Sequence, residues 1–170
     1  RSKFNQRFRI DGTPATDAQI LRWMDAVDQP DHTFFEVSTA MAFYGFAEAA
    51  VDLAILEIGM GGRLDAVNLV DGQASAVVSI SKDHEMYLGT ELRQIASEKL
   101  GVARAGRPLV LGRNMDAYAG QAEATGAKIE LNGRDWRSDE RTVDTSSFQL
   151  SRPTHLLFDA LWDAAAVAVP

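Results

Sequence analysis

Residues 53–65 read Leu-Ala-Ile-Leu-Glu-Ile-Gly-Met-Gly-Gly-Arg-Leu-Asp, and this stretch decides the fold class. Its first half, Leu53–Ile58, is a short apolar run closed by glycines, which is typical of a buried parallel strand. Similar runs alternate with helical patterns further along the chain. Strands are expected at 74–80, 109–111 and 128–131, and helices at 91–105 and 117–125. This alternation predicts an α/β fold built on a parallel sheet.

The segments on either side of this pattern are less regular. Phe4–Ile10 alternates like a short strand and ends at a turn signal. Thr16 is expected to cap a helix over Asp17–Asp28, with an apolar stripe of Ile20, Leu21, Met24 and Val27. A second helix is expected over 35–50, mostly buried. The polar stretch 132–153 fits a loop or short antiparallel strands, and 159–169 is expected to be helical.

Composition limits the class of protein. The chain of 170 residues is long enough for one domain, assigned here to 1–170. It has no cysteine and no run of the roughly 18 apolar residues that a membrane helix needs. The net charge of −7 argues against broad nucleic-acid binding, although four basic residues cluster within the first nine. We therefore expect a cytoplasmic protein with no nucleic-acid or membrane partner, and the charge still allows a small anionic ligand.

The glycines after Leu53–Ile58 are ambiguous when taken alone. Dinucleotide sites and methyltransferase cofactor sites both use glycines after a first strand. However, Leu64 stands where G-x-G-x-x-G has its third glycine. Only Arg63–Leu69 is left for a crossover helix before the next strand, and such crossovers usually take a dozen residues or more. A loop fits this segment better than a cofactor-binding helix.

Two further signals follow the first. Asp83 and His84 come directly after the second expected strand, at the sheet edge where Glu57 ends its own strand. A carboxylate and an imidazole there suit Mg²⁺ or phosphate chemistry, and the alternative is a capping Asp with a hydrogen-bonded His, which is favoured for His84 taken alone. Lys99 lies on the helix that follows, where most lysines are simply solvated.

Taken together these motifs carry a resemblance. Their order along the chain is Thr33–Glu36, Leu56–Asn68, Asp83-His84 with Leu88-Gly89, and Ile95–Gly101. This order resembles the central domain of the dihydrofolate synthase/folylpolyglutamate synthase family, within the Mur ligase superfamily. Phe4–Gly12 is similar to the F-N-E-R-I segment of that family, with Gln6 in the Glu position. The resemblance runs from about Phe4 to Val110 and weakens towards Trp136. It implies a three-layer, parallel-sheet central domain.

The resemblance also implies an activity. Members are ADP-forming carboxylate–amine ligases, in which ATP phosphorylates the carboxylate of dihydropteroate or a folate and glutamate attacks the acyl phosphate. By resemblance, Glu57 and His84 are Mg²⁺ ligands. Lys99 is the candidate carbamylated lysine, whose new carboxylate helps to hold a second Mg²⁺. The pterin would be bound by Thr33, Phe35, Asp65 and Ala66. Core packing of Phe35 and a turn cap at Asp65 are the alternatives for two of these.

The chain departs from the family pattern in several places. Val67 stands where the family has Thr in D-A-T-N, and Lys82 replaces an apolar residue before Asp83. The P-loop G-x-x-x-x-G-K-[ST] is absent from these residues, as are an S-P-H-L segment and the smaller C-terminal domain of the family. Both ends of the chain are expected to be cuts within a longer protein.

Three functions follow as hypotheses. The first is a piece of a folate ligase, usually monomeric in the family, that is inactive by itself and prone to self-association. The second is a pterin- or metal-binding module without catalysis. The third is an unrelated α/β methyltransferase. The sequence does not decide whether the parent protein adds the first glutamate, later ones, or both.

Overall fold

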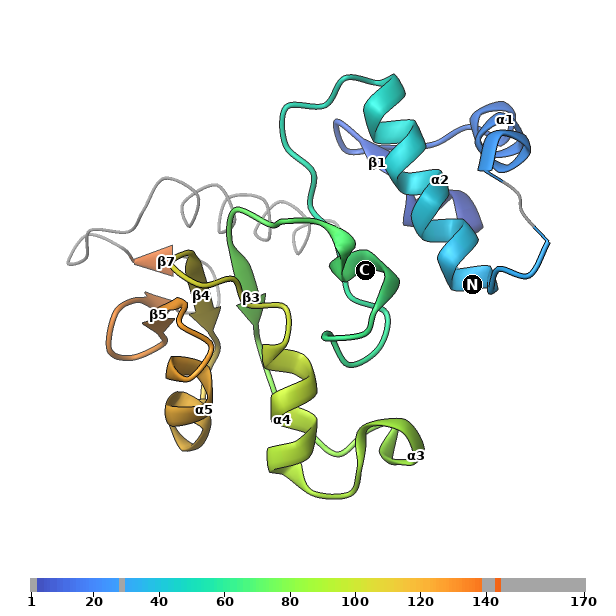
Figure 1. Cartoon of the computed structure of the whole chain (residues 1–170). Helices are drawn as coiled ribbons and strands as arrows, with labels where there is room; N and C mark the ends of the chain where they lie inside the picture. Colours follow the sequence, from blue (N-terminus) through green and yellow to red (C-terminus); the bar gives the residue numbers. More distant parts are fainter. Residues whose placement is uncertain (1–2, 28–29, 139–142, 145–170) are drawn as a thin grey trace. The chain divides into compact units, whose positions relative to one another are not determined.

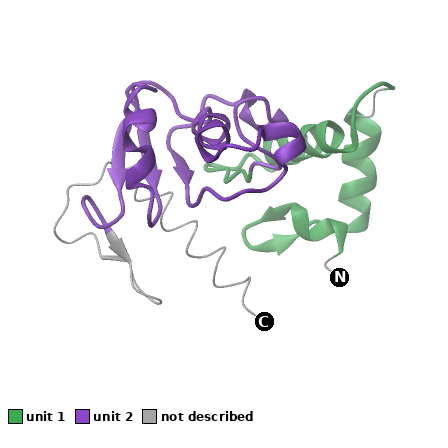
Figure 2. Ribbon diagram, turned by 90° about the horizontal axis from the view of Figure 1, so that it is seen from below, with its two compact units in different colours: residues 1–57 green, residues 58–170 purple. Residues whose placement is uncertain are grey.

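The computed structural model describes residues 3–27, 30–138 and 143–144, and these form two compact units. The first unit comprises residues 1–57 and the second residues 58–170; they are coloured separately in Figure 2. The expected helix at 159–169, and residues 139–142 and 145–153 of the polar stretch 132–153, lie outside the described residues. The assignment of 1–170 to one domain stays a prediction.

The first unit is a pair of helices on a small hairpin. It contains the 3₁₀ helix η1 (Phe4–Arg7), strands β1 (Arg9–Ile10) and β2 (Thr13–Pro14), and helices α1 (Asp17–Val27) and α2 (Phe34–Glu48). The strands β1 and β2 are antiparallel, joined by the turn at Asp11-Gly12. The expected strand at Phe4–Ile10 is wrong over its first half. There the chain forms η1, and the ring of Phe8, the residue after η1, is buried.

Aromatic packing holds this unit together. The core contains Phe8, Ala15, Trp23 and Met41, and the Phe8 and Trp23 rings meet edge to face at a centroid distance of 6.1 Å. An ideal Cβ on Gly45 would lie 2.7 Å from the indole of Trp23, so only glycine lets α2 approach α1 this closely.

The expected apolar stripe of α1 is therefore partly wrong. Ile20 and Val27 pack on the core, but Leu21 and Met24 are exposed and Trp23 takes the central place. The expected burial of α2 is also wrong, because only Thr39, Met41 and Gly45 of that helix are buried. With one partner helix, α2 can cover only one of its faces.

The second unit is built on a parallel sheet of three strands in the order β3-β4-β5 (Figure 1). The strands are β3 (Ser75–Val77), β4 (Pro108–Leu111) and β5 (Lys128–Leu131). All four residues of the central strand β4 are buried. The registers pair Val77 with Leu111 and Leu109 with Ile129. The expected strands at 74–80, 109–111 and 128–131 are confirmed, the first in shorter form.

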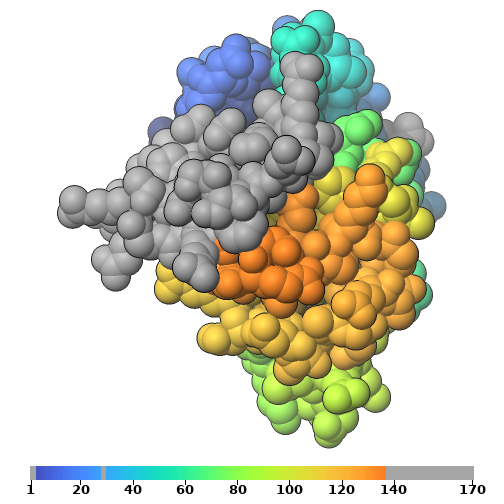
Figure 3. Space-filling model, turned by 90° about the vertical axis from the view of Figure 1, so that its left-hand side faces the viewer, coloured from blue at the N-terminus to red at the C-terminus, as the bar shows by residue number. Residues whose placement is uncertain are grey.

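Helices connect successive strands of this sheet. Helix α4 (Leu92–Leu100) lies between β3 and β4, while η3 (Asp116–Tyr118) and α5 (Ala119–Glu123) lie between β4 and β5. The two helices α4 and α5 contact each other. Leu100 and Ala122 enter the core together with Leu109 and Leu111. In the space-filling view of Figure 3 the yellow and orange residues of α5 and β5 form one continuous surface.

Shorter elements complete the second unit. They are the 3₁₀ helix η2 (Ala66–Leu69), the one-turn helix α3 (Glu85–Leu88), and the antiparallel pair β6 (Arg137–Ser138) and β7 (Val143–Asp144). The η2 turn confirms that no cofactor-binding helix follows the glycines. The pair β6–β7 lies in the stretch 132–153, for which the sequence leaves a loop and short antiparallel strands as alternatives. None of the described helices has the length and apolar character needed to cross a bilayer.

One central expectation is not met. Leu53–Ile58 belongs to no strand or helix, and no described segment forms a ladder with it. Leu53 and Ile55 are about half exposed rather than buried. A strand is stabilised by hydrogen bonds to a neighbour and by side chains packed on its faces, so an apolar run without those partners does not register as one.

Candidate functional site

The glycine-rich loop, Gly59–Asp65, is held in shape by the carboxylate of its last residue. Asp65 Oδ2 accepts hydrogen bonds from the backbone N–H groups of Gly59 and Met60 at 3.0 and 2.9 Å. Asp65 Oδ1 accepts one from Val67 N at 2.9 Å and so caps η2. The turn cap considered from the sequence is thus present. Among the described residues, three of the roughly four lone-pair positions of the carboxylate accept hydrogen bonds.

The same loop is packed against the C-terminal end of α4. Gly62 approaches so closely that an ideal Cβ there would lie 2.7 Å from Glu98 O and 2.9 Å from Lys99 O. A Cβ on Gly101 would likewise lie 2.4 Å from Arg63 Cβ. The two glycines face each other's segments, and both must lack a side chain for the loop and the helix to meet.

Polar contacts fasten this junction. Arg63 N donates to Glu98 O at 2.8 Å, and its guanidinium donates to Glu98 Oε1 through Nη2 at 2.8 Å and Nε at 3.1 Å. The loop therefore supplies partners for a helix end whose last carbonyls have none within the helix. Asn68 Nδ2 adds bonds to Arg63 O and Gly101 O at 3.1 and 3.2 Å.

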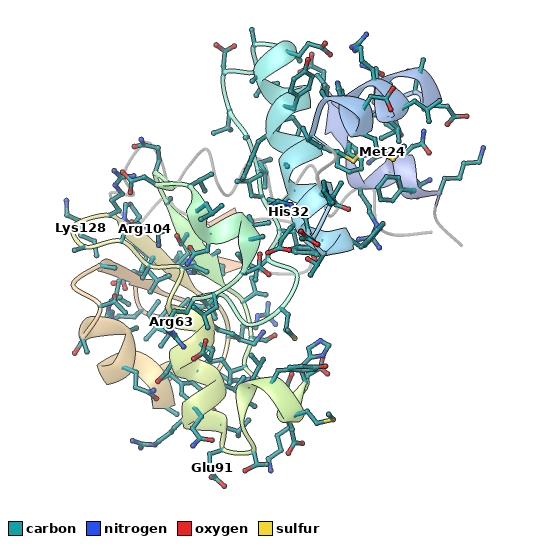
Figure 4. The ribbon with its side chains drawn as sticks, turned by 45° about the vertical axis from the view of Figure 1, so that its right-hand side comes forward. Met24, His32, Arg63, Glu91, Arg104 and Lys128 are labelled. Atoms are coloured by element: carbon teal, nitrogen blue, oxygen red, sulfur yellow. The ribbon has the colours of Figure 1, made fainter. Side chains whose placement is uncertain are left out.

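Two arginines that sequence reasoning missed extend the junction. Arg104 Nη2 donates to Asn68 O, Asn68 Oδ1 and Val70 O at 2.8–2.9 Å. Arg107 Nη1 donates to the carbonyls of Asp71 and Gly72 at 2.6 Å. These contacts tie the segment after the loop to the segment after α4, and Figure 4 labels Arg63 and Arg104. Neither arginine belongs to a motif, so no pattern in the sequence pointed to them.

The Asp83-His84 pair occupies the turn between β3 and α3. His84 has a positive φ of 51° and begins α3 as its N-cap residue. Its backbone N–H donates to Asp83 Oδ1 at 2.8 Å, and its Nε2 lies 3.7 Å from Asp83 Oδ2. Both side chains are at least half exposed. The left-handed backbone is unusual for a non-glycine residue and lies at the start of α3, seven residues after the end of β3.

The motif that follows also reaches the glycine-rich loop. An ideal Cβ on Gly61 would lie 2.9 Å from Leu88 Cδ2, and Gly61 itself has a φ of 68°. Leu88 thus packs on Gly61, while residues within Ile95–Gly101 pack on Gly62 and Arg63. Two segments that are separate in sequence therefore contact the glycine-rich loop within the second unit.

The remaining predicted residues fall into both units. In the first unit, Thr33 is the N-cap of α2 in a complete capping box with Glu36, and Phe35 is half-buried in the first turn. Hydrogen bonds from the Thr33 backbone and side chain lower the pKa of Glu36. Ala66 begins η2 in the second unit and is half-buried. Because Thr33 and Phe35 belong to one unit and Asp65 and Ala66 to the other, their convergence on a pterin stays a prediction.

The convergence of the expected metal ligands on one site also stays a prediction. Glu57 is exposed at the end of the first unit, and His84 is exposed in the second. Lys99 is half-buried in the last turn of α4. Among the described residues no three His, Cys, Asp or Glu side chains gather closely enough to hold a metal ion. The donor types nevertheless suit a divalent cation, since a Glu carboxylate, an imidazole and a carbamate carboxylate supply oxygen and nitrogen ligands.

Comparison with known proteins identifies relatives of this chain. No protein-family model matches the chain. A probable bifunctional folylpolyglutamate synthase/dihydropteroate synthase of Haloferax volcanii is 43% identical over 143 residues, which cover 79% of this chain and 17% of that protein. Escherichia coli FolC, solved in complex with DHPP and ADP, superposes with a TM-score of 0.77 at 27% identity, over 99% of this chain and 44% of that one.

The chain belongs to the dihydrofolate synthase/folylpolyglutamate synthase family. A second solved relative, a bifunctional folylpolyglutamate synthase/dihydrofolate synthase with Mn, AMPPNP and L-glutamate bound, has a TM-score of 0.75 at 32% identity. It is matched over 88% of this chain and 39% of its own. This chain thus spans less than half the length of the synthases it matches. The family assignment confirms the α/β fold of the Mur ligase type and removes the dinucleotide and methyltransferase interpretations of the glycine-rich loop.

Proposed function

We propose that this chain is part of an ATP-dependent ligase that adds L-glutamate to dihydropteroate, to folates, or to both. The observation that carries the proposal is the meeting of three family motifs at the glycine-rich loop, through Gly61, Gly62 and Arg63. Such a junction places the loop that would bind the pterin directly on the helix that carries Lys99. The relatives with ADP, AMPPNP, Mn and L-glutamate bound support a nucleotide, a divalent metal and glutamate as ligands.

In the proposed reaction, ATP phosphorylates the substrate carboxylate and the amine of glutamate displaces phosphate from the acyl phosphate. Glu57, His84 and the carbamylated form of Lys99 would hold Mg²⁺, which neutralises phosphate charge during the transfer. Phe35 would stack on the pterin ring. The carboxylate of Asp65 would accept a hydrogen bond from a ring N–H, with Ala66 and Thr33 beside it. Cytoplasmic localisation and a monomeric parent protein belong to the same proposal.

Titration with dihydropteroate tests the substrate assignment. Calorimetry on the 170-residue chain should show saturable binding, and Phe35→Ala should weaken it by about tenfold, the effect of losing one aromatic contact of about 1.4 kcal/mol. The matched control is Phe34→Ala, since Phe34 is the neighbouring, more exposed ring at the start of the same helix. Absence of saturable binding, or equal effects of both substitutions, would contradict the pterin assignment. S-adenosylmethionine should not bind.

A further inference from the structure

The ion pair between Arg63 and Glu98 lies at a position that matters for the proposed chemistry. Glu98 immediately precedes Lys99, and its side chain is only 24% exposed. The Arg63 backbone N–H bonds the carbonyl of Glu98, while Gly62 lies against the carbonyl of Lys99. The loop therefore contacts the peptide units on both sides of the Cα of Lys99, in the last turn of α4.

We propose that Arg63 and Glu98 are a positioning pair, which sets the environment of the Lys99 amine by clamping the glycine-rich loop on the last turn of α4. The inference deepens the proposed function, since Lys99 is the reactive lysine only if that function is right. Neither residue of the pair is assigned to contact substrate. Their role is to couple the loop that would hold the pterin to the lysine that would hold the metal.

The contacts favour a clamp over an incidental surface pair. Exposed ion pairs between two flexible side chains contribute little, because both partners must be ordered. Here the Arg63 backbone is already fixed by its bond to Glu98 O, and the guanidinium contacts one carboxylate oxygen through two nitrogens. Asn68 bonds both Arg63 O and Gly101 O and so orders the same junction from its other side.

The alternative is a direct charge effect of either residue on Lys99. This alternative predicts that the two single substitutions have opposite effects on the Lys99 amine. Removing the negative charge of Glu98 and removing the positive charge of Arg63 would then change the reactivity of the amine in opposite directions. If the pair acts as a clamp, each substitution releases the same loop. Both substitutions then change the reactivity of the Lys99 amine in the same direction.

Lysine-modification kinetics distinguish these cases. The chain has four lysines, Lys3, Lys82, Lys99 and Lys128, whose rates of acylation by a small water-soluble ester can be separated by peptide mapping. Arg63→Gln and Glu98→Gln should each change the Lys99 rate in the same direction, by about threefold, the loss expected for an ion pair of this exposure. The exposed Lys82 and Lys128 serve as internal references.

The charge-reversed pair and a distant acid provide the controls. Arg63→Glu combined with Glu98→Arg should restore the wild-type Lys99 rate, because the pair is rebuilt with its charges exchanged. Glu91→Gln removes an acid at the opposite end of α4, labelled in Figure 4, and should leave the rate unchanged. Circular dichroism tests whether each variant is folded. Arg63→Lys provides a second, milder variant. Opposite changes, no change, or failure of the reversed pair to restore the rate would overturn the proposal.

The outcome separates this inference from the proposed function. The rates are measured without any ligand, so they test the clamp even if dihydropteroate does not bind. If dihydropteroate binds the wild-type chain and the Lys99 rates are unaffected, the clamp is wrong and the substrate assignment stands. If the rates behave as expected and no pterin binds, the clamp stands and the substrate assignment falls.

Discussion

At the scale of single residues, glycines and a few polar side chains decide how the motifs meet. Gly62 and Gly101 allow the loop and helix α4 to touch. Asp65 then accepts hydrogen bonds from backbone N–H groups of the loop, and Asn68 donates one to the carbonyl group of Gly101. The motif residues were found from the sequence because their order is distinctive. The contacts between these residues could not be found from the sequence, because no spacing rule links residue 62 to residue 98.

The first prediction concerns Gly62. Gly62→Ala should destabilise the second unit by about 1–3 kcal/mol, since the new methyl group would meet backbone carbonyls that cannot move without distorting α4. Gly120→Ala is the matched control. It fills open space in α5 and should stabilise the chain by about 0.5–1 kcal/mol, because alanine loses less entropy in a helix. Urea denaturation measures both, and a neutral Gly62→Ala would contradict the close approach.

At the scale of elements, α1 and α2 show how a polar contact accompanies an aromatic core. Trp23 buries its ring while its indole N–H donates to Glu48 Oε2 at 3.0 Å. Arg22 pairs with the same carboxylate. The sequence predicted both helices and the Thr16 cap. It missed Trp23 as the central core residue, because the choice among neighbouring apolar faces of α1 depends on where α2 lies.

The second prediction is a pH dependence. The hydrogen bond from Trp23 and then the hydrogen bond and charge of Arg22 hold the pKa of Glu48 below its ordinary value. A carboxylate with a lowered folded-state pKa contributes stability above its unfolded pKa of about 4.3, and this contribution is lost as the pH falls through the folded pKa. Glu48→Gln should therefore flatten the loss of stability of the first unit on acidification.

Denaturation curves at a series of pH values, read from the indole N–H resonance of Trp23, measure this slope. Asp25→Asn is the matched control, because Asp25 is an exposed carboxylate on the same pair of helices. If Glu48→Gln and wild type lose stability in parallel on acidification, the contact with Trp23 does not hold the carboxylate charged in the folded chain.

At the scale of the whole molecule, the second unit combines a small sheet with many exposed apolar side chains. Side chains of the glycine-rich loop, η2 and α3 are among the most exposed, including Leu64, Leu69, Met86 and Tyr87. A sheet of three strands with one buried central strand is near the lower limit for independent stability. Exposed apolar area of this kind favours association.

The third prediction is that the 170-residue chain self-associates and is only marginally stable. Sedimentation velocity should show a sedimentation coefficient that rises with concentration. Replacing Leu64 and Leu69 together by Gln should reduce this rise, whereas replacing the half-exposed Leu53 by Gln serves as a comparison in the first unit. A strictly monomeric chain that melts cooperatively above about 60 °C, the upper end of the usual mesophile range, would contradict the prediction.

The fourth prediction concerns ATP. These 170 residues contain no G-x-x-x-x-G-K-[ST], whose backbone amides and lysine would surround the β- and γ-phosphates. Calorimetric titration with Mg-ATP should therefore give only heats of dilution, and purified chain supplied with dihydropteroate, ATP and glutamate should release no ADP. A P-loop ATPase assayed in parallel provides the positive control. Micromolar binding or turnover by this chain would show that the phosphates are held in another way.

The sequence by itself determined the α/β class, the three parallel strands, the positions of the main helices and the family. Periodicity and motif order are local properties of the chain, so they can be read without knowing what packs on what. Only the tertiary structure decided the contacts that need distant partners. Leu53–Ile58 has no described strand beside it and so is not a strand, although its composition favours one. Arg104 donates hydrogen bonds to Asn68 only because the fold brings the chain after α4 beside η2. Local pattern specifies which faces are apolar, whereas hydrogen bonds and close packing depend on which segments the fold brings within reach.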